Sequence, residues 1–178
     1  MPPSGTTYIV DTDVMDHIRW RADSTTIYSG LIGLAKNGTA KTVRQVFGEL
    51  KKHKATHKIL GPHERDFLVA SELQFCSEVQ AKLELVKQHA NHLWEQVGGK
   101  NPDPADPWLV AVASAHGFVL VTDENQISSV KIPAVCKLPS FGCKCISGPH
   151  FLIEVGLVKE IKPEHISPQA FFGIGAQG

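Results

Sequence analysis

Two short, strongly apolar runs stand out along the chain, at residues 7–10 and 118–121. Each is flanked by polar or turn-forming residues, a pattern that predicts buried strands rather than helices. Shorter apolar segments at 42–43 and 144–146 predict two further strands. We therefore expect a small sheet of short strands.

Between these runs, apolar residues recur at helical spacing. This pattern predicts helices at 12–21, 24–36, 45–57, in one or two pieces over 66–97, at 106–116 and at 149–158. The clearest of them starts at Asp106, a good N-cap residue, with Pro107 in the first helical position and Gly117 as the stop.

Strands that alternate with helices favour an α/β fold with a parallel sheet, here a three-layer α/β/α sandwich. The length of 178 residues suits one domain. We place it at residues 1–162. Residues 163–178 contain Pro and Gly, and we expect them to form a C-terminal extension that is partly disordered.

The composition changes this picture little. Eighteen basic residues balance eighteen acidic ones, so any binding of a polyanion must come from a local patch. The pattern contains no signal peptide and no run long enough to cross a membrane, which predicts a cytoplasmic protein.

The four cysteines, Cys76, Cys136, Cys143 and Cys145, are accordingly expected to be free thiols. The last three, with His150 nearby, do not have the spacing of common zinc sites. Small buried side chains near a strand are the interpretation we prefer.

Acidic residues follow both of the clearest strands: Asp11 after the first, and Asp123 with Glu124 after the second. Ligand sites in parallel sheets form at the carboxyl ends of strands, where Asp106 and Glu49 can join them from their helices. Several carboxylates in one place repel one another unless a cation is present, and Mg²⁺ or Mn²⁺ prefers such oxygen ligands. The pattern therefore indicates metal-assisted chemistry.

Each acid also has an ordinary structural explanation. Asp106 is an effective N-cap, and Asp11 and Asp13 are able to cap the helix that follows them. Glu49 alone is typical of a solvated helix face. Taken singly, none of these residues decides between the two interpretations.

The order of the four acidic segments resembles the PIN-domain nucleases. Residues 8–14 (YIVDTDV) resemble the opening strand and its aspartate, and 46–50 (VFGEL) the helical glutamate. Residues 105–113 (ADPWLVAVA) resemble the aspartate that opens a buried helix, and 119–124 (VLVTDE) the strand that runs into Thr-x-Asp. The likeness covers about residues 7–158 and is greatest to a long PIN-like subfamily resembling VapC-type toxins.

The resemblance implies an endoribonuclease that needs Mg²⁺ or Mn²⁺ and leaves 5′-phosphate and 3′-hydroxyl ends. It implies that Asp11 and Asp106 are the principal metal ligands and that Glu49 completes the site. The Thr-x-Asp pattern places the fourth acid at Glu124, with Asp123 beside it, and the choice between them stays open.

Two supporting roles and three partners follow from the same resemblance. Asp13 and Thr122 are expected to support the site through hydrogen bonds. The expected partners are an RNA substrate, a protein antitoxin and a second copy of the chain in a homodimer.

One dense basic run follows Glu49 and contains Lys51, Lys52 and Lys54. We expect these lysines, with Arg19, to bind substrate phosphates; a solvated helix face is the equally weighted alternative. The tryptophans Trp20, Trp94 and Trp108 are candidates for base stacking, with Trp108 expected in the core and Trp94 suited to a dimer or antitoxin groove.

Two other functions compete with the nuclease. A phosphatase of the haloacid-dehalogenase type would use the Asp11-Thr12-Asp13 segment, but it gives Glu49 no role. A PIN-like scaffold that binds RNA or a partner without cleavage would be favoured if one of the four acids were missing, and all are present.

Overall fold

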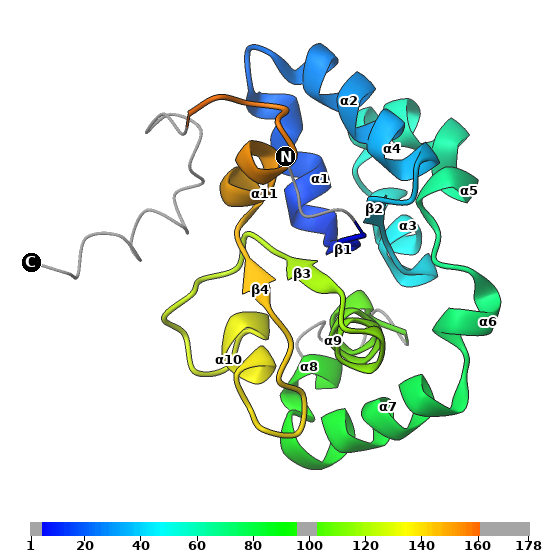
Figure 1. Cartoon of the computed structure of the whole chain (residues 1–178), viewed down its shortest axis with the longest axis vertical. Coiled ribbons are helices and arrows are strands. Elements are labelled where there is room, and N and C mark those ends of the chain that lie inside the picture. Colours follow the sequence, from blue (N-terminus) through cyan, green and yellow to red (C-terminus); the bar gives the residue numbers. More distant parts are fainter. Residues whose placement is uncertain (1–4, 96–102, 161–178) are drawn as a thin grey trace, which may run out of the picture.

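The computed structural model describes residues 5–95 and 103–160 of the chain. Four parallel strands form one sheet in the order β2-β1-β3-β4 (Figure 1). The strands are β1 (Tyr8–Val10), β2 (Ala40–Lys41), β3 (Val119–Val121) and β4 (Cys145–Ile146). The two central strands pair over their full length, from Tyr8 opposite Val119 to Val10 opposite Val121.

Helices cover both sides of the sheet, and the predicted three-layer α/β/α arrangement is confirmed (Figure 1). They are α1 (Thr12–His17), η1 (Ile18–Trp20), α2 (Ser24–Lys36), α3 (Arg44–Leu50), α4 (Lys54–Leu60), η2 (Gly61–His63), α5 (Glu64–Phe67), α6 (Ser71–Gln74), α7 (Ser77–His89), α8 (His92–Glu95), α9 (Ala105–His116), α10 (Ile132–Cys136) and α11 (Gly148–Glu154). In Figure 1, α1, α2 and α11 lie on one side of the sheet, while α9 and α10 lie on the other.

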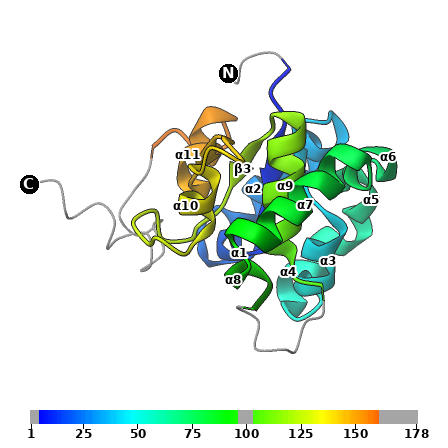
Figure 2. The same ribbon diagram turned by 90° about the horizontal axis from the view of Figure 1, so that it is seen from below.

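The core explains why both central strands are apolar throughout. Every residue of β1 and β3 is buried, because a parallel sheet with helices on both faces exposes neither face to water. Tyr8 packs its ring against Phe151 of α11 at 5.1 Å between centroids. On the other face, α9 runs beside α7 and buries an almost continuous apolar surface (Figure 2).

Three predicted elements differ from the structure. The helix predicted at 45–57 is two helices, α3 and α4, separated by a turn at residues 51–53. The strand predicted at 42–43 lies two residues earlier, as β2, and Thr42 forms only an isolated bridge to Leu68. The helical stretch predicted at 66–97 is, over its described residues 66–95, broken into several helices, of which only α7 exceeds four residues.

The first residue of one predicted helix and the last residue of another also differ from the structure. The helix α9 starts at Ala105 with Pro104 in the N-cap position, so Asp106 lies inside the first turn and is not the cap. Gly117 ends that helix in the left-handed conformation (φ 68°), as predicted. Helix α10 was not predicted, and α11 ends at Glu154, four residues before the predicted end.

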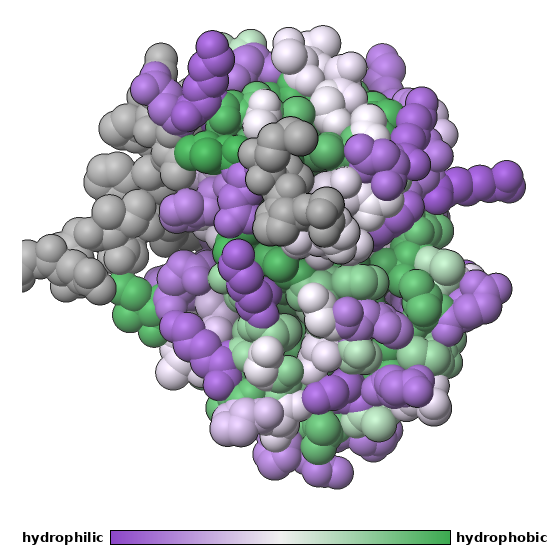
Figure 3. All heavy atoms as spheres, viewed as in Figure 1, coloured by the Kyte–Doolittle hydropathy of each residue, from purple (hydrophilic) through white to green (hydrophobic). Residues whose placement is uncertain are grey.

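The extension predicted at 163–178, with the domain boundary at 162, lies outside the described residues. Within the described part, no helix is long and apolar enough to span a membrane. On the face shown in Figure 3, charged and apolar side chains are interspersed, as expected for balanced charge.

Candidate functional site

The carboxyl ends of β1 and β3 meet because the two strands are parallel neighbours. The ladder continues one residue beyond β1, where the Asp11 amide donates to the Val121 carbonyl at 3.0 Å. Asp11 is buried and caps α1, accepting a hydrogen bond from the Thr12 amide at 2.6 Å. Its second carboxylate oxygen accepts a bond from the Thr122 hydroxyl at 2.9 Å. Capping and site formation are therefore compatible roles of the same side chain.

Glu49 joins this edge from the last turn of α3. Its carboxylate accepts hydrogen bonds from the Thr12 hydroxyl at 2.7 Å and from the Ala105 amide at 3.0 Å. These donors are the chain neighbours of Asp11 and Asp106. Glu49 thus fixes the start of α1 relative to the start of α9, and it is not the freely solvated residue of the alternative interpretation.

Asp106 lies in the first turn of α9, close to the same carboxylates. Burial is the main cause that raises its pKa to about 7, and the negative charges of Glu124 and Glu49 raise it further. The positive charge of Lys131 opposes the shift. A carboxyl group that is desolvated and faces like charges keeps its proton to a higher pH than a solvated one.

The pKa of Asp11 is raised well above its usual range, first by burial and then by the charges of Asp106 and Asp13. The hydrogen bond from Thr122 lowers it in part. Burial likewise raises the pKa of Asp13; His17 opposes the shift, while Asp123 and Glu124 add repulsion. The acids at this edge therefore interact with one another.

Asp123 and Glu124 are neighbours in the chain but have different surroundings. The Glu124 carboxylate accepts a bond from the Ile132 amide at 2.8 Å and forms an ion pair with Lys131 at 3.1 Å. Its backbone amide donates to the Thr122 hydroxyl at 3.2 Å. Because its charge raises the pKa of both Asp11 and Asp106, Glu124 belongs to their cluster.

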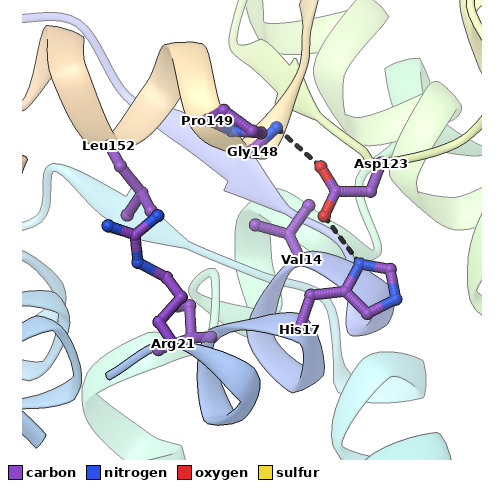
Figure 4. A pocket seen from close by; sticks show the side chains of 8 residues that line it. Val14, His17, Arg21, Asp123, Gly148, Pro149 and Leu152 are labelled. Carbon is purple, nitrogen blue, oxygen red and sulfur yellow. Dashed lines mark hydrogen bonds and ion pairs between the residues drawn. The ribbon is translucent and has the colours of Figure 1, made fainter. Parts of the chain in front are cut away.

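Asp123 is held on the other side of the strand end, where both of its carboxylate oxygens have partners (Figure 4). One accepts a bond from the Gly148 amide at 2.9 Å, and the other lies 2.8 Å from Nδ1 of His17. The ion pair with Asp123 is the main reason that the pKa of His17 is raised. A small pocket adjoins this pair and includes Val14, Arg21 and Leu152 in its lining (Figure 4).

The chemistry of the acid cluster suits a hard divalent cation, because all of its donors are carboxylate oxygens. Burial first and neighbouring negative charges second raise the pKa values of Asp11 and Asp106, and a bound cation would favour the ionised form of both carboxylates. Among residues 5–95 and 103–160, no three His, Cys, Asp or Glu side chains are already spaced to hold a metal ion. The carboxylates suit a divalent cation in donor type and charge. They would have to move closer together to bind it.

Of the predicted substrate-binding residues, Arg19 contacts Asp16, and the run with Lys51, Lys52 and Lys54 is joined to Asp16 through His53. Lys51, Lys52 and Lys54 are exposed at the turn between α3 and α4. His53, within this run, lies 3.1 Å from Oδ2 of Asp16, and Arg19 lies 3.2 Å from Oδ1. Asp16 thereby links the run on α3–α4 to the end of α1.

Asp16 and His17 are two residues beside the site that were not predicted from the sequence. Asp16 is buried and accepts a further bond from the Thr56 hydroxyl at 2.6 Å. His17 lies four residues after Asp13 on one helix, a spacing that places both on the same face and could have indicated it. No comparable signal in the sequence marks Asp16.

The three tryptophans occupy different environments. Trp20 is 74% exposed and has the Arg19 guanidinium 4.1 Å from its ring centre. Trp108 is partly buried, with its indole N–H donating to Asp103 at 2.6 Å. Trp94 is partly buried against the core.

Comparison with known proteins adds a family but no activity. No curated protein and no solved structure matches the chain. One family model, described as "Domain of unknown function (DUF4411)", matches residues 8–157, which span every acid of the cluster. The chain therefore belongs to the DUF4411 family.

Proposed function

We propose that the protein is a divalent-cation-dependent endoribonuclease of the PIN-domain type. The observation that carries this proposal is the carboxylate cluster formed by Asp11, Glu49, Asp106 and Glu124 at the carboxyl ends of β1 and β3. All four acids come from the four segments that resemble PIN-domain motifs. Burial, with the added repulsion of neighbouring acids, raises the pKa values of Asp11 and Asp106, and this environment favours a cation as a partner for their ionised forms.

In this proposal Asp11, Asp106 and Glu124 hold Mg²⁺ or Mn²⁺. Such a cation, when bound, polarises the phosphodiester and lowers the pKa of water at the site. Thr122 orients Asp11 through the 2.9 Å hydrogen bond, and the Ile132 amide orients Glu124. Lys131 balances part of the charge at Glu124.

Glu49 has a positioning role. Its two hydrogen bonds, to the Thr12 hydroxyl and the Ala105 amide, keep the Asp11 and Asp106 backbones at a fixed separation. This role favours a nuclease over a phosphatase that would use Asp11 as a nucleophile.

Substrate RNA would reach the acids along the exposed Lys51, Lys52 and Lys54, with Arg19 beside them. Positively charged side chains on an exposed turn attract backbone phosphates without reading sequence. The toxin role, a protein antitoxin and a homodimer are parts of this proposal that rest on the resemblance to VapC-type toxins.

The test is cleavage of a mixed pool of single-stranded RNA, with a DNA pool in parallel, in Mn²⁺ or Mg²⁺ and in EDTA. We expect metal-dependent cleavage of RNA whose products carry 5′-phosphates, and loss of cleavage in Asp11→Asn. Asp66→Asn makes the same chemical change at a half-exposed site and serves as the matched control. Full activity of Asp11→Asn, or cleavage that persists in EDTA, would contradict the proposal.

A further inference from the structure

The most exposed large apolar side chain in the described part of the chain is that of Trp20, at the end of η1, with 74% of its surface accessible. The Arg19 guanidinium lies over its ring, 4.1 Å from the ring centre. A guanidinium is attracted to the face of an indole, and this contact favours one orientation of the exposed ring. The ring still has most of its area available for contact with a ligand.

The buried Asp16, three residues before Arg19, holds this pair in place. Its Oδ1 accepts a hydrogen bond from the Thr56 hydroxyl at 2.6 Å and lies 3.2 Å from Nε of Arg19. Its Oδ2 lies 3.1 Å from Nδ1 of His53. One carboxylate therefore joins the Arg19–Trp20 pair to the turn between α3 and α4. A contact surface that is fixed in advance loses less conformational entropy when a ligand binds.

The turn between α3 and α4 runs beside α1, from the acid cluster towards Trp20. Glu49 contacts Thr12 at 2.7 Å. Four residues further along each segment, His53 contacts Asp16 at 3.1 Å. The two segments are thus in step as they leave the carboxyl ends of the strands. Trp20 follows four residues after Asp16, roughly 6 Å further along the helix at about 1.5 Å per residue.

The side chains along this path carry positive charge. Lys51, Lys52 and Lys54 are exposed, and none of them forms an ion pair with a carboxylate within residues 5–95 and 103–160. Free ammonium groups attract the phosphates of a nucleic acid, and an aromatic ring beside them stacks on its bases. Lysines are depleted from protein–protein interfaces, so their presence beside Trp20 favours a nucleic acid over a protein as the ligand.

We propose that Trp20, held by Arg19 and Asp16, stacks on a base of single-stranded RNA whose phosphates contact the lysines of the neighbouring turn. Every base has a face that can stack, so this subsite guides the strand and contributes affinity without reading sequence. The inference rests on the proposed function for the identity of the ligand, and it adds an aromatic subsite beyond the acids.

The experiment measures binding of short oligo(U) to the folded full-length protein in EDTA, where the proposed nuclease is inactive. An abasic strand of the same length serves as a second probe. We expect Trp20→Ala to weaken oligo(U) binding about 5- to 150-fold, the range for one stacked base, and to leave binding of the abasic strand unchanged. Trp20→Phe keeps a ring and should retain most of the affinity. Oligo(U) should quench the tryptophan fluorescence of the wild type, but not that of Trp20→Phe.

Leu138→Ala is the matched control, because it shortens an exposed apolar side chain that follows α10, in the other helical layer. This variant should bind oligo(U) as the wild type does. The inference is overturned if the wild type does not bind oligo(U), if Trp20→Ala binds it equally well, or if Trp20→Ala loses affinity equally for the abasic strand. A change of oligomeric state in Trp20→Ala with unchanged RNA affinity would overturn it in favour of a protein interface.

Failure of this inference is distinguishable from failure of the proposed function. Binding that depends on Trp20, together with no cleavage in Mn²⁺, would contradict the nuclease and support the subsite. Cleavage in Mn²⁺, together with binding that does not depend on Trp20, would contradict the subsite alone.

Discussion

Asp123 and Glu124 are consecutive in the chain, yet they belong to two regions of opposite character. On one side, Asp123 is matched by the Gly148 amide and by His17, so its negative charge is balanced inside the protein. On the other, Glu124 joins Asp11 and Asp106, whose pKa values are raised first by burial and then by neighbouring negative charges, that of Glu124 among them. A balanced buried carboxylate stabilises the fold, while an unbalanced cluster is unfavourable until something positive binds to it.

The largest expected effect is on catalysis. Asp106→Asn should reduce metal-dependent RNA cleavage by about 1,000-fold or more, a loss of about 4 kcal/mol of transition-state stabilisation. Asp123→Asn keeps the shape of the side chain on the balanced side and should retain cleavage within about threefold, less than about 1 kcal/mol. Rates measured under single-turnover conditions decide this, and equal losses in both variants would remove the distinction between the two regions.

The next effect is on the pH dependence of stability. The pKa of Asp106 is raised to about 7 in the folded protein, so the folded state binds more protons than the unfolded state between about pH 4 and 7. The contribution of Asp106 to stability is therefore fully present below about pH 4 and is lost as the pH rises through about 7. In EDTA, the decrease in the free energy of unfolding with rising pH should be smaller in Asp106→Asn than in the wild type, by up to about 3 kcal/mol. Chemical denaturation at pH 5 and pH 8 measures this decrease. An unchanged pH dependence in Asp106→Asn would show that Asp106 is not destabilised by its neighbours.

A smaller effect is expected on the balanced side. A Cβ at Gly148 would lie 2.6 Å from Oδ1 of Asp123 and 3.1 Å from Val14, so Gly148→Ala must push the carboxylate away. We expect a loss of about 1–3 kcal/mol in the free energy of unfolding. Gly33→Ala, where a Cβ would meet nothing within 4 Å on helix α2, should instead stabilise the protein slightly. The opposite order of the two variants would contradict the role of Gly148.

The smallest effect concerns the exposed lysines. Neutralising Lys51 and Lys52 together should lower the salt dependence of single-stranded RNA binding by about 1.4 in the slope of log K against log salt. Neutralising Lys36 and Lys87, which lie on α2 and α7, should leave the slope unchanged. Binding isotherms in Ca²⁺ at several salt concentrations measure the slope for each double variant. Equal slopes for the two variants would show that the basic run is a solvated surface that does not bind RNA.

The sequence was most informative where apolar runs and acids coincide. Asp11 could be placed at a strand end because 7–10 is strongly apolar, and β3 was predicted for the same reason. The break between α3 and α4 was missed because its lysines suit a helix equally well, and only packing ends α3 at Leu50. Propensity is a weak guide when tertiary contacts decide.

The different surroundings of Asp123 and Glu124 could not be predicted from the sequence. It depends on Gly148, 25 positions after Asp123, and on Ile132, 8 positions after Glu124, whose backbone amides each donate a hydrogen bond to one of the two carboxylates. The Thr-x-Asp pattern pointed to position 124, but the sequence alone left both neighbours open. Likewise, the N-cap explanation of Asp106 failed because Ala105 begins the helix when its amide bonds to Glu49.

The most direct test of the central claim is Mn²⁺ binding, measured by calorimetry on the wild-type protein, Glu124→Gln and Asp123→Asn. We predict one cation per chain for the wild type, with affinity reduced at least about tenfold, or about 1.4 kcal/mol, in Glu124→Gln and unchanged in Asp123→Asn. Absence of binding to the wild type, or loss of binding in Asp123→Asn with retention in Glu124→Gln, would contradict it.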